Sequence, residues 1–320
     1  MKYLITGGAG FLGINLAEKL LENKKNKVYL IDNLSKNIQK KSLSNLIKNK
    51  NVKFIKKDLS DILDYLKICD FDYIFHFAAI LGVQKVIDNP YDTLKDNIQT
   101  TIKLINFSKK QKRLKKICFT STSEVYAQTL EKKLAKYPTP ENIDFLISKD
   151  FKPRSAYFLS KIVGEYLMNY SKLDFVIFRP HNIFGPNMGF SHVIPQLTKK
   201  ILDKKSKKII ITNSNHKRTF CYIDFAINLI LKISHDKKSS KKIYNIGSPN
   251  SDISIMQLAK KIMKILNVKK KLLQSKKIED NSPKKRRPDM NKSIIFFKSK
   301  HNFDEGLHKT VSWYKRYFLS

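Results

Sequence analysis

The stretch Thr6-Gly7-Gly8-Ala9-Gly10-Phe11-Leu12-Gly13 decides the fold of this 320-residue chain. It follows a run typical of a buried strand and opens an amphipathic helical pattern. Gly7, Gly10 and Gly13 have the Gly-x-x-Gly-x-x-Gly spacing. The missing side chains there permit a tight turn and a close approach of backbone N–H groups to a pyrophosphate. Because the following helix N-terminus adds partial positive charge, the stretch predicts a strand–turn–helix that binds a dinucleotide.

Asp32 ends the second predicted strand, Val28–Asp32, about 20 residues beyond Gly13. A carboxylate at this place accepts hydrogen bonds from the adenosine ribose and repels a 2′-phosphate, which favours NAD over NADP. Lys36, just downstream, leaves NADP open as an alternative.

Strands and helices alternate along the chain, which predicts βαβ units and an α/β fold. We expect a Rossmann-type doubly wound parallel sheet with a smaller, interleaved C-terminal region. Residues 1–180 would form the cofactor domain, to which 219–247 return, and 181–218 with 248–320 would form the second region. Predicted strands are Lys2–Thr6, Val28–Asp32, Val52–Lys56, Tyr73–Phe77, Lys116–Thr120, Phe175–Arg179, Ile209–Thr212 and Ile243–Ile246; predicted helices are Phe11–Asn23, Asp92–Lys110, Ser155–Tyr170, Gln196–Lys204 and Ser254–Leu266. Lys269–Asp289 is basic and contains proline, which predicts mostly loop.

The charge is strongly positive, with 63 Lys+Arg against 27 Asp+Glu and a formal net charge of +36. This excess would fit a nucleic-acid partner, but only seven basic residues are arginine, the residue suited to specific readout, and the lysines are spread along the chain. We expect no nucleic-acid partner and no membrane span. Three scattered cysteines, Cys69, Cys118 and Cys221, indicate neither a disulfide framework nor a metal site, so a cytoplasmic protein is expected.

Tyr157 and Lys161 lie four residues apart on a predicted helix and hence on one face of it. The pKa of a free tyrosine is about 10, and a nearby ammonium favours the phenolate, so the pair can supply a base near neutral pH. Upstream, Thr122 and Glu124 follow the predicted strand Lys116–Thr120. Because the carboxyl ends of parallel strands face the ligand crevice, we expect these side chains on the cofactor side of the sheet.

Together these motifs resemble the extended short-chain dehydrogenase/reductase family, in its NAD-dependent nucleotide-sugar epimerase/dehydratase/decarboxylase branch. The resemblance covers nearly the whole chain. Besides the glycine stretch and the Tyr157/Lys161 pair, it rests on Asp32-Asn33-Leu34, His76-Phe77-Ala78-Ala79, Ser121-Thr122-Ser123-Glu124-Val125-Tyr126, Arg179-Pro180-His181-Asn182-Ile183-Phe184-Gly185-Pro186 and Arg286-Arg287-Pro288-Asp289.

The resemblance implies oxidation of the sugar 4-hydroxyl, with Tyr157 taking its proton, Lys161 lowering the tyrosine pKa and Thr122 hydrogen-bonding the reacting oxygen. It implies a tightly held NAD whose contacts are Gly7, Gly10, Phe11, Leu12, Gly13, Asp32, Asn33, Asp58, Leu59, Phe77, Ala78, Ala79, Asn97, Tyr157, Lys161 and Pro180. For a nucleotide-diphosphate sugar it implies contacts from Thr122, Ser123, Asn182, Val193, Arg218, Arg286 and Arg287. The resemblance implies no metal. It does imply a homodimer, formed through the helices near Asp92–Lys110 and Ser155–Tyr170.

Glu124 bears on the reaction. Within the resemblance, Ser123-Glu124 is similar to UDP-glucuronate decarboxylases and GDP-mannose dehydratases, whereas 4-epimerases usually carry a small or hydroxyl residue in place of the glutamate. Lys152-Pro153-Arg154 and Lys285-Arg286-Arg287-Pro288-Asp289 favour a decarboxylase, because an arginine there could hold a uronate carboxylate. A nucleotide-sugar 4-epimerase, a C3/C5 epimerase and a 4,6-dehydratase stay open. A non-catalytic NAD-binding or nucleic-acid-binding protein is the alternative of a different class.

Overall fold

The computed structural model describes residues 1–35, 40–62, 70–250, 252–275 and 283–319. Lys36 and Cys69 lie outside these residues. The chain divides into two units: Met1–Val125, Ile147–Pro180 and Ile230–Tyr244 form the first, and Tyr126–Leu146, His181–Leu229 and Asn245–Ser320 form the second. In the part of the chain described, no helix is long and apolar enough to cross a membrane.

The first unit is built on a seven-stranded sheet with the order β11-β6-β5-β4-β1-β2-β3. The paired strands from β3 to β6 all run parallel. This order places β1 inside the sheet between β4 and β2, with later strands added on both sides, as the predicted doubly wound α/β fold requires. The strands are β1 (Lys2–Thr6), β2 (Lys27–Asp32), β3 (Val52–Lys56), β4 (Tyr73–His76), β5 (Lys116–Thr120), β6 (Phe175–Pro180) and β11 (Lys242–Ile246).

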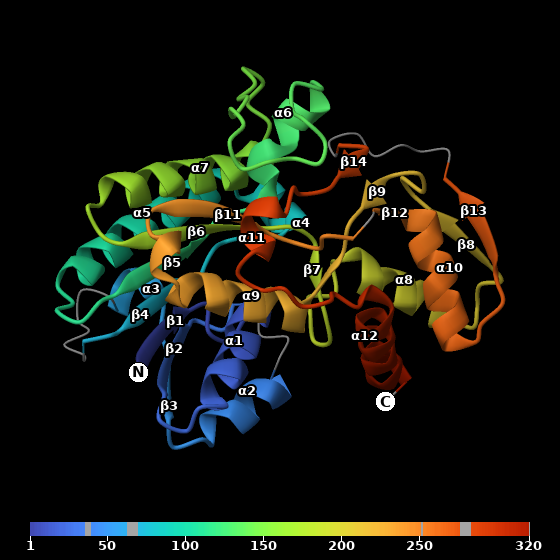
Figure 1. The fold of residues 1–320 in the computed structure, drawn as a ribbon. Coiled ribbons are helices and arrows are strands. Elements are labelled where there is room, and N and C mark those ends of the chain that lie inside the picture. Colours follow the sequence, from blue (N-terminus) through green and yellow to red (C-terminus); the bar gives the residue numbers. More distant parts are fainter. Residues whose placement is uncertain (36–39, 63–69, 251, 276–282, 320) are drawn as a thin grey trace. The chain divides into compact units, whose positions relative to one another are not determined.

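Helices cover both faces of this sheet (Figure 1). One face carries α5 (Pro90–Lys109) and α7 (Ser155–Tyr170), whose Ile105 and Met168 pack on Phe119 of β5. The other face receives the end of α9 (Ile223–His235), where Ser234 accepts a hydrogen bond from Cys118 at 3.2 Å. The remaining elements of this unit are α1 (Phe11–Leu21), α2 (Lys40–Ile47), α3 (Leu59–Ile62), α4 (Val83–Asp88) and the short helical turns η1 (Ser123–Tyr126) and η2 (Lys237–Ser239).

The register of the parallel strands decides which side chains share a face. Thr6 of β1 pairs with His76 of β4, and His76 pairs with Phe119 of β5. All three side chains therefore point toward the α5/α7 face, since paired residues of a sheet lie on the same side. This row lies at the carboxyl ends of the strands, where α/β sheets bind their ligands.

The second unit packs the three helices α8 (Val193–Leu202), α10 (Ile255–Leu266) and α12 (Phe303–Leu319) around a core that includes Ile201, Leu258 and Val311. Ser254 caps α10 through a reciprocal capping box with Gln257. Small sheets join β8 (Lys208–Ile211) to β13 (Lys271–Gln274), β7 (Ile183–Phe184) to β10 (Cys221–Tyr222), and β9 (Lys217–Arg218) to both β12 (Ile253–Ser254) and β14 (Lys285–Arg286). Two short helices, α6 (Ala127–Glu131) and α11 (Asn291–Ile294), complete it.

The structure differs from the sequence prediction in several places. The basic segment predicted as loop contains β13 and β14, which form because β8 and β9 offer them backbone partners. The long helices α9 and α12 and the short helices α2, α3, α4, α6 and α11 were not predicted. Residues 126–146 and 219–229, expected with the cofactor domain, belong to the second unit, where Thr139 exchanges backbone hydrogen bonds with Arg287 and Asp289.

Candidate active site

The glycine turn between β1 and α1 has no room for side chains. A Cβ atom at Gly7 would lie 2.7 Å from the backbone nitrogen of Ala78, and one at Gly13 would lie 2.8 Å from the Cα atom of Gly8. Gly7 also has a φ of +67°, a left-handed conformation that favours glycine. The Gly10 N–H donates to the Gly7 carbonyl at 3.0 Å and closes the turn. The turn therefore brings bare backbone to the start of α1, as a pyrophosphate site requires.

Asp32 stands at the end of β2 beside this turn. Its carboxylate accepts hydrogen bonds from the N–H of Ala9 at 3.1 Å and from the N–H of Leu34 at 2.8 Å. Burial raises the pKa of Asp32, and these two hydrogen bonds oppose the shift. The neighbouring Asn33 donates to Asp58 at 2.7 Å, so the ends of β2 and β3 are linked.

The segment after β4 packs against the glycine turn. Ala78 donates its N–H to the Thr6 hydroxyl at 3.3 Å. Asn97 of α5 accepts from the N–H of Ile80 at 2.7 Å and donates to the Ile80 carbonyl and to Ser160, both at 3.1 Å. Its amide thus holds the loop after β4 against α7, which places Asn97 behind the loop that carries the predicted cofactor contacts Phe77, Ala78 and Ala79.

Thr122, Glu124 and Tyr157 meet at the carboxyl end of β5. Tyr157, in the first turns of α7, faces Thr122. Burial raises the pKa of Tyr157 above its ordinary value, the nearby Glu124 carboxylate raises it further, and the Thr122 hydroxyl lowers it. The structure brings the predicted tyrosine, threonine and glutamate together.

Lys161 lies one helical turn beyond Tyr157 and is almost fully buried. Its ammonium donates to the Thr120 carbonyl at 2.8 Å and lies 5.0 Å from the centre of the Phe119 ring. Burial lowers the pKa of Lys161 to about 8, and the Glu165 carboxylate opposes that shift. Burial, with a smaller contribution from the Lys161 charge, lowers the pKa of His76 to about 3, so His76 is neutral at physiological pH.

Glu124 has a cationic partner that the sequence did not assign to it. The Arg154 guanidinium lies 3.3 Å from the Glu124 carboxylate, and both side chains are partly exposed. Arg154 immediately precedes α7, one turn before Tyr157. A carboxylate and an arginine therefore stand together beside the tyrosine hydroxyl.

The second unit holds the predicted anion contacts. Arg218 of β9 pairs in register with Arg286 of β14, and both side chains are almost fully buried. Arg218 donates to the carbonyls of Lys217 at 2.7 Å and Lys284 at 3.2 Å. Paired residues on neighbouring strands share a face, so the two guanidinium groups belong to one side of this small sheet.

Two of the other predicted contacts of this unit make hydrogen bonds of their own. Asn182 donates to the Thr219 carbonyl at 2.9 Å. Arg287 donates to the Pro249 carbonyl at 3.5 Å, and Val193 begins α8. In the first unit, Ser123 is buried at the start of η1 and Pro180 ends β6.

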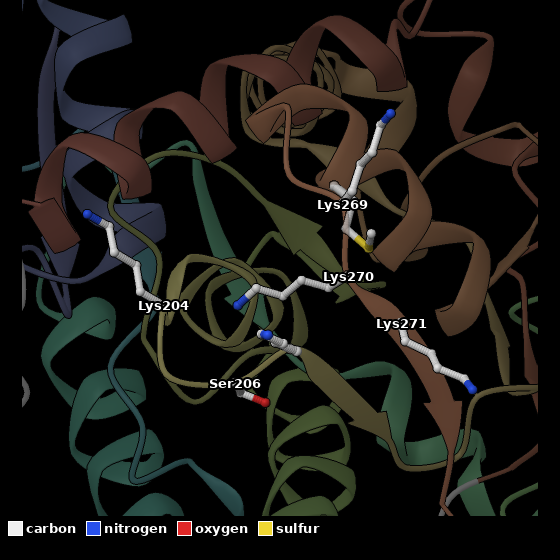
Figure 2. A pocket seen from close by; sticks show the side chains of 7 residues that line it. Lys204, Ser206, Lys269, Lys270 and Lys271 are labelled. Atoms are coloured by element: carbon white, nitrogen blue, oxygen red, sulfur yellow. The ribbon is translucent and has the colours of Figure 1, made fainter.

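A cavity of about 680 Å³ in the second unit contains none of these predicted residues. Five lysines line it, with Ser206 and Met263. In Figure 2 the amines of Lys204, Lys269 and Lys271 point in different directions rather than toward one centre. The lysines therefore do not converge on one anion. Among the residues described, no group of three or more histidine, cysteine, aspartate or glutamate side chains is arranged to hold a metal ion.

A family model decides the relationship. The model for the NAD dependent epimerase/dehydratase family matches residues 3–247, which is more than half of the chain. The chain belongs to this family. It is accordingly an NAD-dependent enzyme, and the glycine turn and Asp32 are features that fit that cofactor.

Curated relatives of this epimerase/dehydratase family member include different enzymes. The bifunctional polymyxin resistance protein ArnA of Wigglesworthia glossinidia brevipalpis is 31% identical over 83% of this chain; the chain spans only 41% of that protein. UDP-glucuronic acid decarboxylase 3 of Arabidopsis thaliana is 27% identical, with 96% of this chain and 87% of the relative covered. The dTDP-D-glucose 4,6-dehydratase of Bos taurus is 29% identical over 99% of this chain and 89% of its own.

Solved structures agree with the fold. A UDP-glucose 4-epimerase from Thermotoga maritima, solved with UDP-glucose, has a TM-score of 0.85 at 25% identity and covers 99% of this chain and 100% of its own. A UDP-glucuronic acid 4-epimerase from Bacillus cereus, in complex with UDP-glucuronic acid and NAD, has a TM-score of 0.80 at 25% identity with the same coverage.

Sequence reasoning missed three residues of this family member's site: His76 and Glu165 were given no role, and Arg154 was not assigned as a partner of Glu124. The spacing of Glu165, four residues beyond Lys161 on the same helix, was the one available signal. The contacts of His76 and Arg154 join separate elements of the unit, so no spacing along the sequence reveals them.

Proposed function

We propose that this enzyme modifies a nucleotide-diphosphate sugar through a 4-keto sugar, with Tyr157 as the base. The observation that carries the proposal is the meeting of Thr122, Glu124 and Tyr157 at the carboxyl end of β5, with Lys161 one helical turn away. The names of the relatives support the substrate class, since they include UDP-sugar and dTDP-sugar enzymes.

In the proposed reaction, Thr122 and Tyr157 hydrogen-bond the 4-hydroxyl of the sugar, and Tyr157 removes its proton. Burial and the Glu124 charge raise the pKa of Tyr157, so the phenolate needs a cation beside it. Lys161, on the same face of α7, can supply that charge. When bound, NAD supplies the oxidation of the sugar at C4 and the later reduction that makes the enzyme redox-neutral.

NAD would be held chiefly by the turn around Gly7, Gly10 and Gly13 and by the Asp32 carboxylate. The close packing at Gly7 and Gly13 supports this assignment, because a Cβ atom there would collide with neighbouring backbone and open the tight turn that a pyrophosphate site requires. The residues proposed to complete the site are Phe11, Leu12, Asn33, Asp58, Leu59, Phe77, Ala78, Ala79, Tyr157, Lys161 and Pro180, with Asn97 acting through the loop that it holds.

The second unit would bind the anionic part of the substrate. Arg218 and Arg286 share one face of a small sheet, and two guanidinium groups can bind a diphosphate with paired hydrogen bonds. Ser123, Asn182, Val193 and Arg287 are proposed as further substrate contacts. A uridine nucleotide is favoured because most of the sugar-nucleotide relatives compared above act on or bind UDP-sugars.

Among the possible reactions we favour decarboxylation of a UDP-uronate. Oxidation at C4 makes the C5 carboxylate that of a β-keto acid, so carbon dioxide leaves and C5 takes a proton. Arg154, 3.3 Å from Glu124, is a cation near Tyr157 that could hold such a carboxylate. A 4-epimerase or a 4,6-dehydratase is the alternative, favoured by the epimerase and dehydratase relatives.

The mass of the product separates these reactions. The purified enzyme would be incubated with UDP-glucuronate, UDP-glucose, UDP-N-acetylglucosamine and dTDP-glucose, and each mixture analysed by mass spectrometry. Decarboxylation predicts that UDP-glucuronate alone loses carbon dioxide. Loss of water would identify a dehydratase, and a stereoisomer of unchanged mass would identify an epimerase; either result would replace the decarboxylase assignment.

A substitution at Glu124 also distinguishes decarboxylation or dehydration from 4-epimerisation. Glu124→Gln removes the carboxylate beside Tyr157, and we expect kcat for decarboxylation or dehydration to fall by about 100-fold or more, the usual contribution of a positioned acid or base. Simple 4-epimerisation would be spared. Steady-state kinetics measure the effect, with Glu131→Gln on α6 as the control. An unchanged kcat for carbon dioxide release in Glu124→Gln would remove Glu124 from the reaction.

We further propose a homodimer formed through α5 and α7, and a cytoplasmic location. Exposed apolar side chains on the two helices support the dimer: Tyr91 and Ile102 on α5, and Val163, Tyr166 and Tyr170 on α7.

A further inference from the structure

A buried ion pair lies next to Lys161 and takes no part in the reaction outlined above. The Arg179 guanidinium binds the Glu165 carboxylate with two hydrogen bonds, of 2.8 Å from Nε to Oε1 and 2.5 Å from a terminal nitrogen to Oε2. The Ser121 hydroxyl donates to the same carboxylate. Glu165 is only 5% exposed and Arg179 only 2%, so the pair is almost removed from solvent.

The pair joins three elements of the first unit. Glu165 comes from the middle of α7, Arg179 from the end of β6, and Ser121 from the residue after β5. Ser121 precedes Thr122, and its own N–H donates to the Phe178 carbonyl at 2.8 Å. The same carboxylate thus fixes the strand end that carries Thr122 against the helix that carries Tyr157 and Lys161.

The pair also controls the charge around Lys161. Among the described residues, the charged and titratable groups that interact with this ammonium are Glu165 of α7 and His76 of β4, and Arg179 of β6 acts on it through Glu165. His76 is neutral, and the Arg179 cation neutralises Glu165. Without Arg179, Glu165 would be a bare carboxylate one helical turn from Lys161 and free to pair with it.

We propose that Glu165 and Arg179 are positioning residues: their ion pair locks the end of β5 to α7 and keeps Glu165 from capturing the Lys161 ammonium, which stays available to Tyr157. The inference rests on the proposed function for the role of Tyr157. Its electrostatic part concerns Lys161 alone and can be measured without any substrate.

The direct test is the titration of Lys161 by NMR. Protein labelled with 13C at the lysine Cε atoms would be titrated with pH, and the Lys161 signal assigned by its absence from Lys161→Met. Because burial lowers the pKa of Lys161 to about 8, the signal should titrate well below those of exposed lysines. In Glu165→Gln the unpaired Arg179 cation should lower the midpoint by about one pH unit, a tenfold change in the proton affinity.

Removing the positive partner, Arg179, should shift the Lys161 midpoint in the direction opposite to removing the negative partner, Glu165. Arg179→Gln leaves the Glu165 charge and should raise the midpoint. Glu165→Gln combined with Arg179→Gln leaves no net charge and should return the midpoint to the wild-type value. Glu131→Gln on α6 is the control, with no expected shift. A folded Glu165→Gln protein, as judged by circular dichroism and NAD binding, whose Lys161 midpoint is unchanged would overturn the electrostatic part.

Two further variants test the positional part, and they keep the inference testable if a single neutralising variant does not fold. Glu165→Asp keeps the charge but shortens the reach of the carboxylate, so the Lys161 midpoint should stay near wild type while kcat falls by about tenfold or more. The double variant should also titrate normally and lose kcat. Wild-type kcat in both would overturn the positional role. Normal titration shifts without turnover of any nucleotide sugar would instead leave this pair's electrostatic role intact and reject the proposed function.

Discussion

At the residue scale, burial changes the chemistry of side chains that the sequence marks as ordinary. His76 is the clearest case. Its Nδ1 lies 2.7 Å from the Thr6 hydroxyl, and the whole side chain is 1% exposed beside a buried ammonium. Burial, with a smaller contribution from Lys161, lowers its pKa from 6.5 to about 3, so the folded protein does not protonate it over most of the acidic range.

This depressed pKa predicts a loss of stability in mild acid. Between pH 6.5 and about 3 the unfolded chain binds a proton at His76 that the folded chain does not, so the free energy of unfolding falls as pH falls through this window. At pH 5 the contribution amounts to about 2 kcal/mol. Urea unfolding at about pH 7 and 5 should therefore show a smaller loss in His76→Asn than in the wild type. His308→Asn, at an exposed position of α12, serves as the control. Equal losses in all three proteins would contradict the burial argument.

Site residues could be predicted from the sequence where their spacing along the chain indicated a shared position. Tyr157 and Lys161 were identifiable because four residues on a helix bring two side chains to one face. Glu124 was identifiable because it follows a buried strand. The sequence does not predict the ion pairs Glu124–Arg154 and Glu165–Arg179, because each pair depends on how separate elements pack together. The sequence suggested that Arg154 could hold a substrate carboxylate, and that role stays a proposal; the structure adds that Arg154 pairs with the protein's own Glu124.

At the element scale, the connection from β1 to α1 is tightly constrained. Gly7 needs a positive φ, and it also lies directly against the backbone of Ala78. The glycine spacing predicted this turn, and the turn formed as expected. The packing of the turn against the loop after β4 was not predictable, because that loop comes about 70 residues later in the chain.

The close contact at Gly7 makes alanine costly there. Gly7→Ala adds a Cβ that would lie 2.7 Å from the Ala78 nitrogen, in a left-handed conformation. We expect a loss of about 1–3 kcal/mol in the free energy of unfolding, and weaker NAD binding by tenfold or more.

Gly306→Ala on α12 is the matched control for this turn. Its Cβ would lie 2.9 Å from that of Tyr222, so it should also lower stability, but without affecting NAD. Calorimetric titration of NAD into the folded variants distinguishes Gly7→Ala from Gly306→Ala by their affinity for NAD. Equal NAD affinity in Gly7→Ala and the wild type would argue against the turn as the pyrophosphate site.

Elements of the second unit were harder to predict. β13 and β14 are short and lysine-rich, and they exist because β8 and β9 pair with them, which no local pattern reports. The long core-forming elements of the first unit were predicted within a few residues, because strands buried on both faces form continuous apolar runs.

At the scale of the whole molecule, the net charge of +36 does not identify the site. The proposed anion contacts depend on the glycine turn and on a few arginines, whereas the lysine-lined cavity of Figure 2 has divergent amines. A general attraction of anionic substrates would weaken with salt.

The exposed aromatic surface of α5 and α7 supports the proposed homodimer. Tyr166 is 53% and Tyr170 71% exposed, and their rings lie 6.0 Å apart on one face of α7. Replacing both with glutamate should place charges in the proposed dimer contact and give a monomer in light scattering coupled to size-exclusion chromatography. Ile210→Glu, at an exposed position of β8, should remain dimeric. A wild-type protein that is monomeric, or a double variant that stays dimeric, would rule out this face.

The most direct test of the central claim is the transient absorbance of NADH during turnover. The NAD-loaded enzyme would be mixed with UDP-, GDP-, dTDP- and CDP-sugars in a stopped-flow spectrometer, and the Tyr157→Phe protein, checked for bound NAD, would be treated in parallel. We predict that one sugar nucleotide produces a transient NADH signal and a product, and that Tyr157→Phe binds NAD but produces neither. Normal turnover in Tyr157→Phe would contradict the assignment of Tyr157 as the base.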